Sequence, residues 1–391
     1  MVEAKTIQSS LMQTYNRFPI TVAKGKGSYV WDTDGCRFLD FTAGIATCNL
    51  GHVPQAVKEA VSSQLEELWH CSNLYHIDAQ EKLAALLTEY SCLDQVFFCN
   101  SGAEANEAAI KLVRLFSTER SNIVTFRQSF HGRTMATLSA TGQGKIQTGF
   151  APLLKGFTYF PYNDRVSLAR LKVEQPAAVM LELVQGEGGV IPAEQDWIDE
   201  LVQICTDLQI LLVIDEVQTG MGRTGSLFAY QQYGLEPDII TLAKGLGSGF
   251  PIGAMLAKKR IAQAFQPGSH GSTFGGNPLA ATAGLATVTE LVHSPVIQNG
   301  AEKSMLLITY LKQLKQEFPQ IKTIRGRGLL IGMEVADVPA GEIVQAAIQE
   351  KLLILTAGPS VIRLLPPLTI TEDDILLFIK KFRSVLTHVF S

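Results

Sequence analysis

The most constraining feature of the sequence is a series of short apolar runs separated by longer stretches, several of which have helical periodicity. Five such runs occur in the middle of the chain, at Gln95–Cys99, Ile123–Phe126, Ala177–Leu181, Ile210–Ile214 and Ile239–Ala243. Strands that are buried on both faces between helices have this composition, whereas half-exposed strands alternate apolar and polar residues. We therefore expect an α/β fold whose large domain is a mostly parallel sheet flanked by helices.

The remainder of the chain has a different texture. A chain of 391 residues exceeds what one hydrophobic core usually organises. Two long helical stretches, Pro278–Val292 and Val296–Glu317, predict a smaller α+β layer, and Asp34-Gly35 predicts the turn of an early hairpin. We predict an N-terminal segment (1–55) that joins the small domain, a large cofactor-binding domain (56–282) and a C-terminal small domain (283–391).

Charge and cysteine usage exclude several classes of partner. The formal net charge is −4, so nucleic acid is not expected as a partner. The six cysteines are scattered without a CxxC pair, which argues against structural zinc and against a disulfide framework. Residues Met1–Gln13 lack the basic and apolar regions typical of a secretory signal, and no apolar run of about 18 residues is found in the sequence. We expect a cytoplasmic protein without a metal and without a membrane partner.

Two polar residues follow neighbouring apolar runs, where ligands of open α/β sheets bind. Asp215 follows one run and Lys244 follows another, so we expect the acid and the lysine at equivalent depths in the sheet. A lysine against an apolar strand end is partly desolvated, which favours the neutral amine that attacks a carbonyl to form a Schiff base. The alternative is an ion pair between Lys244 and Asp215. Gly245, Gly247 and Gly249 favour the catalytic interpretation, because they would let the backbone approach a ligand.

The segment Asn100–Asn106 joins an apolar run to a helix predicted from about Ala105 to Phe116. Free amides at a helix start, with Gly102 allowing close approach, are suited to a phosphate. The alternative is a purely structural capping box between Ser101 and Glu104. From this segment alone, both interpretations stay open.

Two further segments carry groups suited to a flat ligand with a carboxylate. Phe130 or His131 could stack on a heteroaromatic ring, and Arg133 offers a bidentate partner for a substrate carboxylate. A core phenylalanine and a surface arginine are the alternative. Glu182, followed by Gln185–Gly189, suggests a pocket edge, although a solvated turn would have the same composition.

Two rival functions have some support in the sequence. Gly220–Gly225 matches the GxGxxG pattern of a dinucleotide-binding dehydrogenase, but the expected acidic residue about 20 positions later, at the end of a second strand, is absent. A non-catalytic module that only binds an amine or a cofactor is the other alternative. The presence of Lys244, Asp215, Phe130 and Arg133 together argues against it.

Taken together, these segments resemble the class III aminotransferases of pyridoxal-phosphate fold type I, over essentially the whole chain. The matching blocks are Asn100–Asn106 (NSGAEAN), Ser129–Thr134 (SFHGRT), Glu182–Gly189 (ELVQGEGG), Asp215–Gly225 (DEVQTGMGRTG), Thr241–Gly247 (TLAKGLG) and Gly271–Leu279 (GSTFGGNPL). The resemblance implies pyridoxal 5'-phosphate as cofactor, bound to Lys244 as a Schiff base, with Asp215 holding the pyridine nitrogen protonated.

The resemblance also implies roles for other residues. The implied cofactor contacts are Ser101, Gly102, Ala103, Phe130, His131, Val217, Gln218 and, across a dimer interface, Thr273. The implied substrate contacts are Arg133, Ser272, Glu182, Glu187 and Arg363. Arg133 would bind the α-carboxylate, and a switchable Glu187–Arg363 pair would open for the second carboxylate of 2-oxoglutarate. The active sites of a homodimer would then be shared.

The segments Tyr15–Pro19, Ala43–Ala46 and Ser72–Tyr75 resemble one branch of the family. That likeness implies transfer of the amino group of N2-acetylornithine to 2-oxoglutarate, giving N-acetylglutamate 5-semialdehyde and glutamate in arginine biosynthesis. Ornithine, succinylornithine and 4-aminobutyrate stay open as amino donors, because enzymes for all of them share these cofactor motifs.

Overall fold

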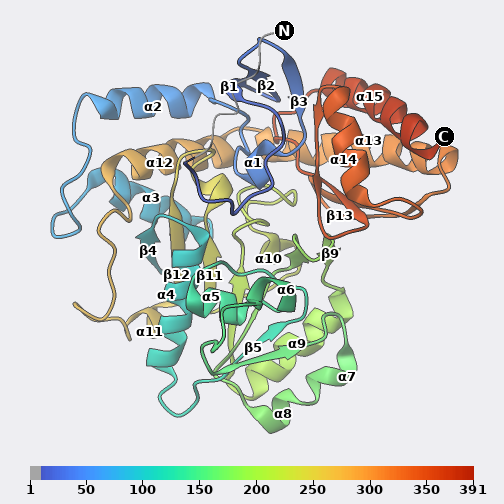
Figure 1. Cartoon of the computed structure of the whole chain (residues 1–391). Helices are drawn as coiled ribbons and strands as arrows, with labels where there is room; N and C mark the ends of the chain where they lie inside the picture. The colour runs from blue at the N-terminus through green and yellow to red at the C-terminus, as the bar shows by residue number, and fades with distance from the viewer. Residues whose placement is uncertain (1–9) are drawn as a thin grey trace.

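The computed structural model describes residues 10–391, and its central element is a seven-stranded sheet (Figure 1). In spatial order its strands are β4 (Gln95–Cys99), β12 (Gly253–Ala257), β11 (Ile239–Leu242), β10 (Leu211–Asp215), β7 (Ala178–Leu181), β5 (Ile123–Phe126) and β6 (Phe157–Phe160). Only β12 runs antiparallel to its neighbours in this sheet. The predicted mostly parallel α/β sheet is therefore confirmed.

All five apolar runs form strands of this sheet, but two of its strands were not predicted. β12 has the sequence GAMLA, in which glycine and alanine have low strand propensity. β6 has the sequence FTYF, which mixes polar and aromatic residues. Neither contains a valine or an isoleucine, whereas each of the other five strands does.

The side chains of the central strands alternate between two hydrophobic clusters. On β10, Leu212 and Ile214 pack into one cluster, whereas Leu211 and Val213 pack into the other. This is the two-residue period of a strand that is buried on both faces. Helix α4 covers one face with Ala108, Leu112 and Val113, and α9 covers the other with residues that include Trp197.

Helices cover the sheet and link its strands (Figure 1). The helices of the first part of the chain are α1 (Ala43–Ala46), α2 (Gln55–Leu65), α3 (Asp78–Glu89), α4 (Gly102–Phe116), α5 (Met135–Ala140), α6 (Gly144–Gln147), α7 (Arg165–Leu168) and α8 (Leu171–Glu174). Those of the second part are α9 (Gln195–Asp207), α10 (Ala229–Gln232), α11 (Lys259–Ala262), α12 (Pro278–His293), α13 (Val296–Glu317), α14 (Ala340–Gln349) and α15 (Glu372–Phe390). The predicted stretches Pro278–Val292 and Val296–Glu317 correspond to α12 and α13. Among residues 10–391, no helix is both long and apolar enough to span a membrane.

The C-terminal part forms a second layer with its own four-stranded sheet. In spatial order its strands are β13 (Ile321–Arg327), β14 (Leu330–Val335), β17 (Val361–Leu364) and β16 (Leu355–Thr356). Helices α13, α14 and α15 lie beside this sheet (Figure 1). A small antiparallel pair, β8 (Val184–Gln185) and β9 (Ile191–Pro192), lies between β7 and α9 in sequence.

The start of the described chain joins this C-terminal layer. Strands β1 (Val22–Lys26), β2 (Tyr29–Asp32) and β3 (Arg37–Asp40) form an antiparallel meander, and β3 pairs in parallel with β15 (Leu352–Leu353). The predicted hairpin is present, with Tyr29 opposite Leu39. The division into residues 1–55, 56–282 and 283–391 stays a prediction, and residues 1–9 of its first segment lie outside the described residues.

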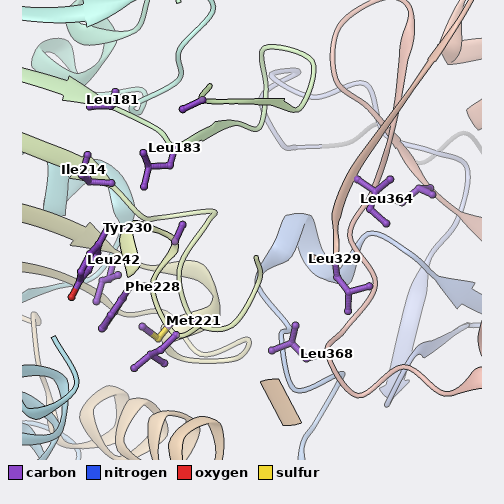
Figure 2. Close-up of a cluster of buried hydrophobic side chains, with 14 of the residues drawn as sticks. Leu181, Leu183, Ile214, Met221, Phe228, Tyr230, Leu242, Leu329, Leu364 and Leu368 are labelled. Carbon is purple, nitrogen blue, oxygen red and sulfur yellow. The ribbon is translucent and has the colours of Figure 1, made fainter. Parts of the chain in front are cut away.

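Buried side chains connect the two layers into one core (Figure 2). Leu181 and Ile214 come from the central sheet, and Met221 comes from the loop that follows β10. Leu329 and Leu364 come from the C-terminal layer, and all five belong to the same cluster. Because that core is continuous, the edge of the central sheet is held at a fixed position against the second layer.

Candidate active site

A cavity of about 450 Å³ opens at the carboxyl ends of the parallel strands. This volume suits a cofactor with a small substrate. The predicted site residues that line it are Ser101, Gly102, Ala103, Phe130, His131, Arg133, Glu182, Glu187, Asp215, Val217, Gln218 and Lys244. Segments that are far apart in the sequence thus meet at one place.

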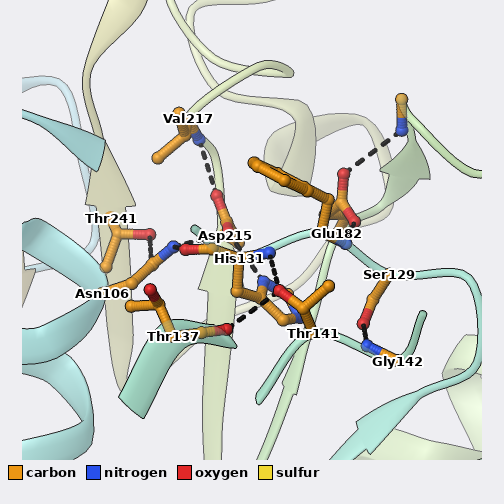
Figure 3. Close-up of polar contacts among 12 residues, drawn as sticks. Asn106, Ser129, His131, Thr137, Thr141, Gly142, Glu182, Asp215, Val217 and Thr241 are labelled. Atoms are coloured by element: carbon orange, nitrogen blue, oxygen red, sulfur yellow. Dashed lines mark hydrogen bonds and ion pairs between the residues drawn. The ribbon is translucent and has the colours of Figure 1, made fainter. Parts of the chain in front are cut away.

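Asp215 is the buried centre of a polar network (Figure 3). Its side chain is 3% exposed. Its Oδ2 accepts hydrogen bonds from Asn106 Nδ2 at 2.8 Å and lies 2.8 Å from His131 Nδ1, while its Oδ1 accepts from the Val217 amide at 3.0 Å. Thr241 in turn donates to Asn106 Oδ1 at 2.6 Å. The carboxylate is therefore fixed in orientation from three sides.

His131 lies against Asp215 and is itself held by its backbone. Its side chain is completely buried, and its amide donates to Thr141 Oγ1 at 2.9 Å. The other ring nitrogen, Nε2, has no hydrogen-bond partner among the described residues. The ring was predicted to contact the cofactor, with stacking as one mode, and its bond to Asp215 gives it a second role as a partner of that carboxylate.

Lys244 lies in a short 3₁₀ turn, Lys244–Leu246, just beyond β11. Asp215 is opposite Thr241 in the sheet, three residues before Lys244. Lys244 therefore lies further beyond the sheet edge than Asp215, and the expectation of equal depth was wrong. Burial lowers the pKa of Lys244 to about 8, and Glu187 opposes this shift. Its φ of 41° is uncommon outside glycine, a type of local strain that often marks a functional site.

Glu187 and Arg363 form an ion pair at the wall of the cavity. Arg363 Nη1 lies 2.5 Å from Glu187 Oε1 and donates to Gln218 Oε1 at 3.3 Å. Burial favours a higher pKa for Glu187, but the Arg363 guanidinium outweighs it and the pKa is lowered overall. Arg363 is on β17 of the second layer, so this pair connects the two layers at the cavity.

Glu182 lines the cavity but its oxygens accept hydrogen bonds from the backbone. Oε1 accepts from the Phe130 amide at 2.8 Å and Oε2 from the Gly186 amide at 3.2 Å. Burial raises its pKa to about 7, although the charge of His131 acts in the opposite direction. Glu182 thereby holds together the loop that carries Phe130 and the loop that leads to Glu187.

The capping box at the start of α4 is present, and phosphate binding there stays a prediction. The Glu104 amide donates to Ser101 Oγ at 3.2 Å, and Glu104 Oε2 accepts from the Asn100 amide at 2.8 Å. Gly102 and Ala103 nevertheless line the cavity. The helix begins at Gly102 rather than near Ala105, because this cap orders its first turn.

Arg133 and Phe130 lie together at the cavity. The guanidinium carbon of Arg133 is 5.5 Å from the centroid of the Phe130 ring, and the Arg133 side chain is exposed. The arginine is therefore at the open side of the cavity, where a soluble carboxylate can reach it.

Three predicted residues do not line the cavity. Arg363 is paired with Glu187, which does line it. Ser272 lies next to it, where its Oγ accepts from Asn100 Nδ2 at 3.3 Å. Thr273 is exposed, and its predicted role requires a neighbouring subunit.

Two of the three glycines that follow Lys244 do not let the backbone approach a ligand, as had been expected of all three. A Cβ at Gly245 would lie 2.3 Å from Asn49 Nδ2, and one at Gly247 would lie 2.1 Å from the Phe250 carbonyl oxygen. These two glycines allow close packing within the protein rather than close approach to a ligand. Only Gly249 of the three lines the cavity.

The GxGxxG segment Gly220–Gly225 packs against the second layer. A Cβ at Gly222 would lie 2.6 Å from Leu368 Cδ1, and Arg223 is completely buried. Neither residue lines the cavity, so this segment does not have the placement that dinucleotide binding would require.

Asn106 is a functional candidate that the sequence reasoning missed. It lines the cavity and donates to both Asp215 Oδ2 and the carbonyl of His131, the latter at 2.7 Å. The signal was its spacing: Asn106 is four residues after Gly102 and therefore on the same helix face.

The comparisons with known proteins are consistent across the whole chain. Residues 11–386 match the family model described as aminotransferase class-III. The chain belongs to the class III aminotransferases. An acetylornithine aminotransferase from Oceanobacillus iheyensis is 56% identical over 390 residues, covering 98% of each chain.

Solved structures of other aminotransferases have the same fold. The ornithine aminotransferase of Toxoplasma gondii superimposes with a TM-score of 0.93 at 30% identity, over 97% of this chain and 93% of that one. The N-acetylornithine aminotransferase of Stenotrophomonas maltophilia superimposes with a TM-score of 0.85 at 38% identity, over 96% and 98%. The predicted family and its fold type I are confirmed.

Enzymes of this class depend on pyridoxal phosphate, and the residues of the cavity fit that cofactor. Asp215 is a buried carboxylate with one oxygen bonded only to an amide, which suits a protonated ring nitrogen. The start of α4 suits a phosphate, and Lys244 has a pKa lowered towards neutrality. Phe130 and Val217 supply apolar surface for a flat ring. The chain is a pyridoxal-phosphate-dependent aminotransferase.

Proposed function

We propose that this enzyme transfers the amino group of N2-acetylornithine to 2-oxoglutarate, giving N-acetylglutamate 5-semialdehyde and glutamate, a step of arginine biosynthesis. The juxtaposition of Lys244, Asp215 and Arg133 in one cavity supports amino transfer between carboxylated substrates. The choice of donor is supported by the 56% identity to an acetylornithine aminotransferase over nearly the full length of both chains.

In this proposal Lys244 is the catalytic acid and base. Pyridoxal phosphate supplies an aldehyde that takes up the amino group and a ring that withdraws electrons. Lys244 Nζ, once displaced by the substrate amine, removes the proton from the carbon that carried the amine and later delivers a proton on the other side of the transfer. A pKa of about 8 for Lys244 suits both directions near neutral pH.

Asp215 would hold the pyridine nitrogen of the cofactor protonated. Its Oδ1 would face the ring nitrogen, and the bonds from Asn106 and His131 to Oδ2 keep it from rotating. A buried carboxylate with no arginine or lysine bonded to it gains from a protonated ring nitrogen. Ser101, Gly102, Ala103 and, from the neighbouring subunit, Thr273 would hold the phosphate.

Arg133 would bind the α-carboxylate of each substrate, with Ser272 beside it. The Glu187–Arg363 pair would distinguish the two half-reactions. While the pair is closed, Arg363 is neutralised by Glu187; when 2-oxoglutarate binds, Arg363 would turn to its second carboxylate. Glu182 would shape the substrate side of the cavity by holding the two loops.

We also propose a homodimer with shared active sites. Large apolar side chains are exposed on the segment after α2 and near Thr273, including Trp69 (62% exposed), Leu74 (86%) and Phe274 (59%). Such a concentration of exposed apolar side chains is typical of a protein interface. We further propose that the enzyme works in the cytoplasm and that residues 1–55 act with the small domain.

Steady-state rates test the choice of amino donor. We expect kcat/KM with 2-oxoglutarate to be highest for N2-acetylornithine among acetylornithine, succinylornithine, ornithine, 4-aminobutyrate and lysine. Equal values for ornithine and acetylornithine would overturn the proposed donor and leave the aminotransferase assignment intact.

A further inference from the structure

Arg133 lies at the cavity without a bond that fixes its own side chain. Among residues 10–391, its guanidinium forms no hydrogen bond and no ion pair, and its guanidinium carbon is 5.5 Å from the centroid of the Phe130 ring. All five N–H groups of the guanidinium are therefore available for a carboxylate. The place where the guanidinium meets a substrate depends on the backbone that carries Arg133.

The backbone before Arg133 is packed tightly against two helices. Gly132 has a φ of 141°. A Cβ at this position would lie 2.5 Å from Thr137 Oγ1, on α5, and 3.0 Å from Ala103 Cβ, on α4. The backbone that enters Arg133 therefore has no room to shift towards either helix.

The backbone after Arg133 is held by a single carboxylate oxygen of α4. Glu107 Oε1 accepts a hydrogen bond from Thr134 Oγ1 at 2.5 Å. The same oxygen accepts from the amides of Ala136 at 3.1 Å and Thr137 at 3.4 Å. These amides are in the first turn of α5, where an amide has no partner within its own helix. Glu107 is half-buried and does not line the cavity.

Glu107 separates the substrate side of this loop from its cofactor side. Its neighbour Asn106 also holds the loop, by donating to the His131 carbonyl at 2.7 Å, but it donates to Asp215 as well. Loss of Asn106 would therefore disturb the cofactor end of the cavity too. The groups that Glu107 binds belong to the segment that follows Arg133, and none of them is a predicted cofactor contact.

We propose that Glu107 is a positioning residue of the reaction, which holds Arg133 where it meets the carboxylate of the amino donor and that of 2-oxoglutarate. The inference rests on the proposed role of Arg133 in carboxylate binding. Glu107 acts through Thr134 and the first turn of α5, which fix the backbone of Arg133. Its loss should therefore raise KM for both substrates and leave kcat and cofactor binding nearly unchanged.

The alternative is that Glu107 only stabilises α5. A carboxylate that accepts from the free amides of a helix start stabilises that helix in any case. That role predicts a lower free energy of unfolding, with unchanged kinetic constants in the folded enzyme. The two interpretations differ in KM, and they differ in whether the effect of Glu107 requires Arg133.

The test is a double-mutant cycle in the cofactor-loaded enzyme, with Glu107→Ala, Arg133→Ala and the two combined. For each enzyme, kcat and KM are measured with N2-acetylornithine and with 2-oxoglutarate, together with the absorbance of the lysine-bound cofactor. We expect Glu107→Ala to raise both KM values about fivefold to tenfold, less than Arg133→Ala does, with unchanged absorbance. In the Arg133→Ala background, Glu107→Ala should change KM by less than about twofold, because the two residues act through one contact.

Further variants separate the hydrogen bonds of Glu107 from general destabilisation. Glu107→Gln keeps an acceptor oxygen at this position, so its KM values should stay within about twofold of those of the unmutated enzyme. Asp164→Ala is the matched control, because Asp164 Oδ1 accepts from the Val166 amide at 3.2 Å at the start of α7 and does not line the cavity. Should Glu107→Ala fold poorly, Thr134→Val removes one of the same bonds and should raise both KM values by a smaller factor.

Three results would overturn the proposal. They are unchanged KM values in Glu107→Ala, an equal effect of Glu107→Ala with and without Arg133, and a defect in Glu107→Gln as large as that in Glu107→Ala. If Arg133→Ala itself leaves both KM values unchanged, the proposed role of Arg133 fails together with this one. If Arg133→Ala raises them and Glu107→Ala does not, the role of Arg133 stands and only this inference fails.

Discussion

His131 Nδ1 lies 2.8 Å from Asp215 Oδ2, and the two side chains are 0% and 3% exposed. A buried carboxylate is costly unless it is paired, and here the pairing is shared between a histidine and Asn106. This arrangement fixes the orientation of Asp215 and leaves its other carboxylate oxygen, Oδ1, bonded only to the Val217 amide.

Loss of the histidine should therefore weaken the cofactor site without abolishing the fold. We expect His131→Phe to lower kcat/KM about tenfold to a hundredfold, as for the loss of a hydrogen bond to a charged group. Asp215→Asn should cost at least as much, because it removes the charge itself. Both effects are checked by steady-state kinetics and by titration of the apoenzyme with pyridoxal phosphate. Equal activity of His131→Phe and the unmutated enzyme would contradict the proposed support of Asp215.

Substitution of Lys244 should remove turnover and the visible absorbance of the lysine-bound cofactor. General acid and base catalysis contributes roughly 10²–10⁴-fold, and loss of the covalent link adds to that. Lys244→Ala is measured by single-turnover kinetics and by borohydride reduction followed by peptide mapping. Lys258→Ala is the matched control, because Lys258 directly follows β12 at the edge of the sheet away from Lys244. Cofactor that is still fixed by borohydride in Lys244→Ala would disprove the assignment.

Arg133→Ala should weaken both half-reactions. A charge-assisted partner of a carboxylate contributes about 2 kcal/mol or more, so kcat/KM should fall at least about thirtyfold for the amino donor and for 2-oxoglutarate. Rapid mixing with each substrate separately measures the two half-reactions. A loss that is confined to the donor would exclude a shared role in carboxylate binding.

His52 should make stability depend on pH in alkaline solution. Chiefly through its hydrogen bond with Asp40, its pKa is raised from 6.5 to about 10 in the folded protein, so its contribution is fully present below about pH 6.5 and is lost as the pH rises through 10. We expect the difference in unfolding free energy between the unmutated enzyme and His52→Gln to shrink over this range. Denaturant titrations at several pH values measure it. The exposed His76 provides the control substitution, His76→Gln, and an identical pH profile for both variants would refute the prediction.

The strands could be predicted from the sequence where a short apolar run contained valine or isoleucine. β10 and β11 are buried on both faces, so their apolar composition identified them as strands. The polar residues that follow them indicated the edge of the sheet at which the cavity lies. β12 was missed because its glycine and alanine residues have low strand propensity. The equal depth of Asp215 and Lys244 was predicted wrongly, since the turn after β11 cannot be derived from strand composition.

The sequence predicted which residues line the site, but it did not predict which groups those residues contact. Asp215, Lys244 and Arg133 line the cavity as the spacing of the strands implied. The use of Glu182 as a backbone acceptor depends on two loops meeting in space, which a linear pattern does not contain. Gly245 and Gly247 were misinterpreted for the same reason, because the neighbours that exclude a Cβ come from distant segments.

The pairing of β3 with β15 joins two segments that are far apart in the sequence, and this affects when the cavity can form. The strand that leads into Thr47, on the wall of the cavity, cannot complete its sheet until Leu352 has been synthesised. The first part of the chain to be made is therefore among the last to reach its final place. Cofactor binding should accordingly follow release of the nearly complete chain, and a truncation before β15 should leave the cavity open along the side formed by residues 40–50.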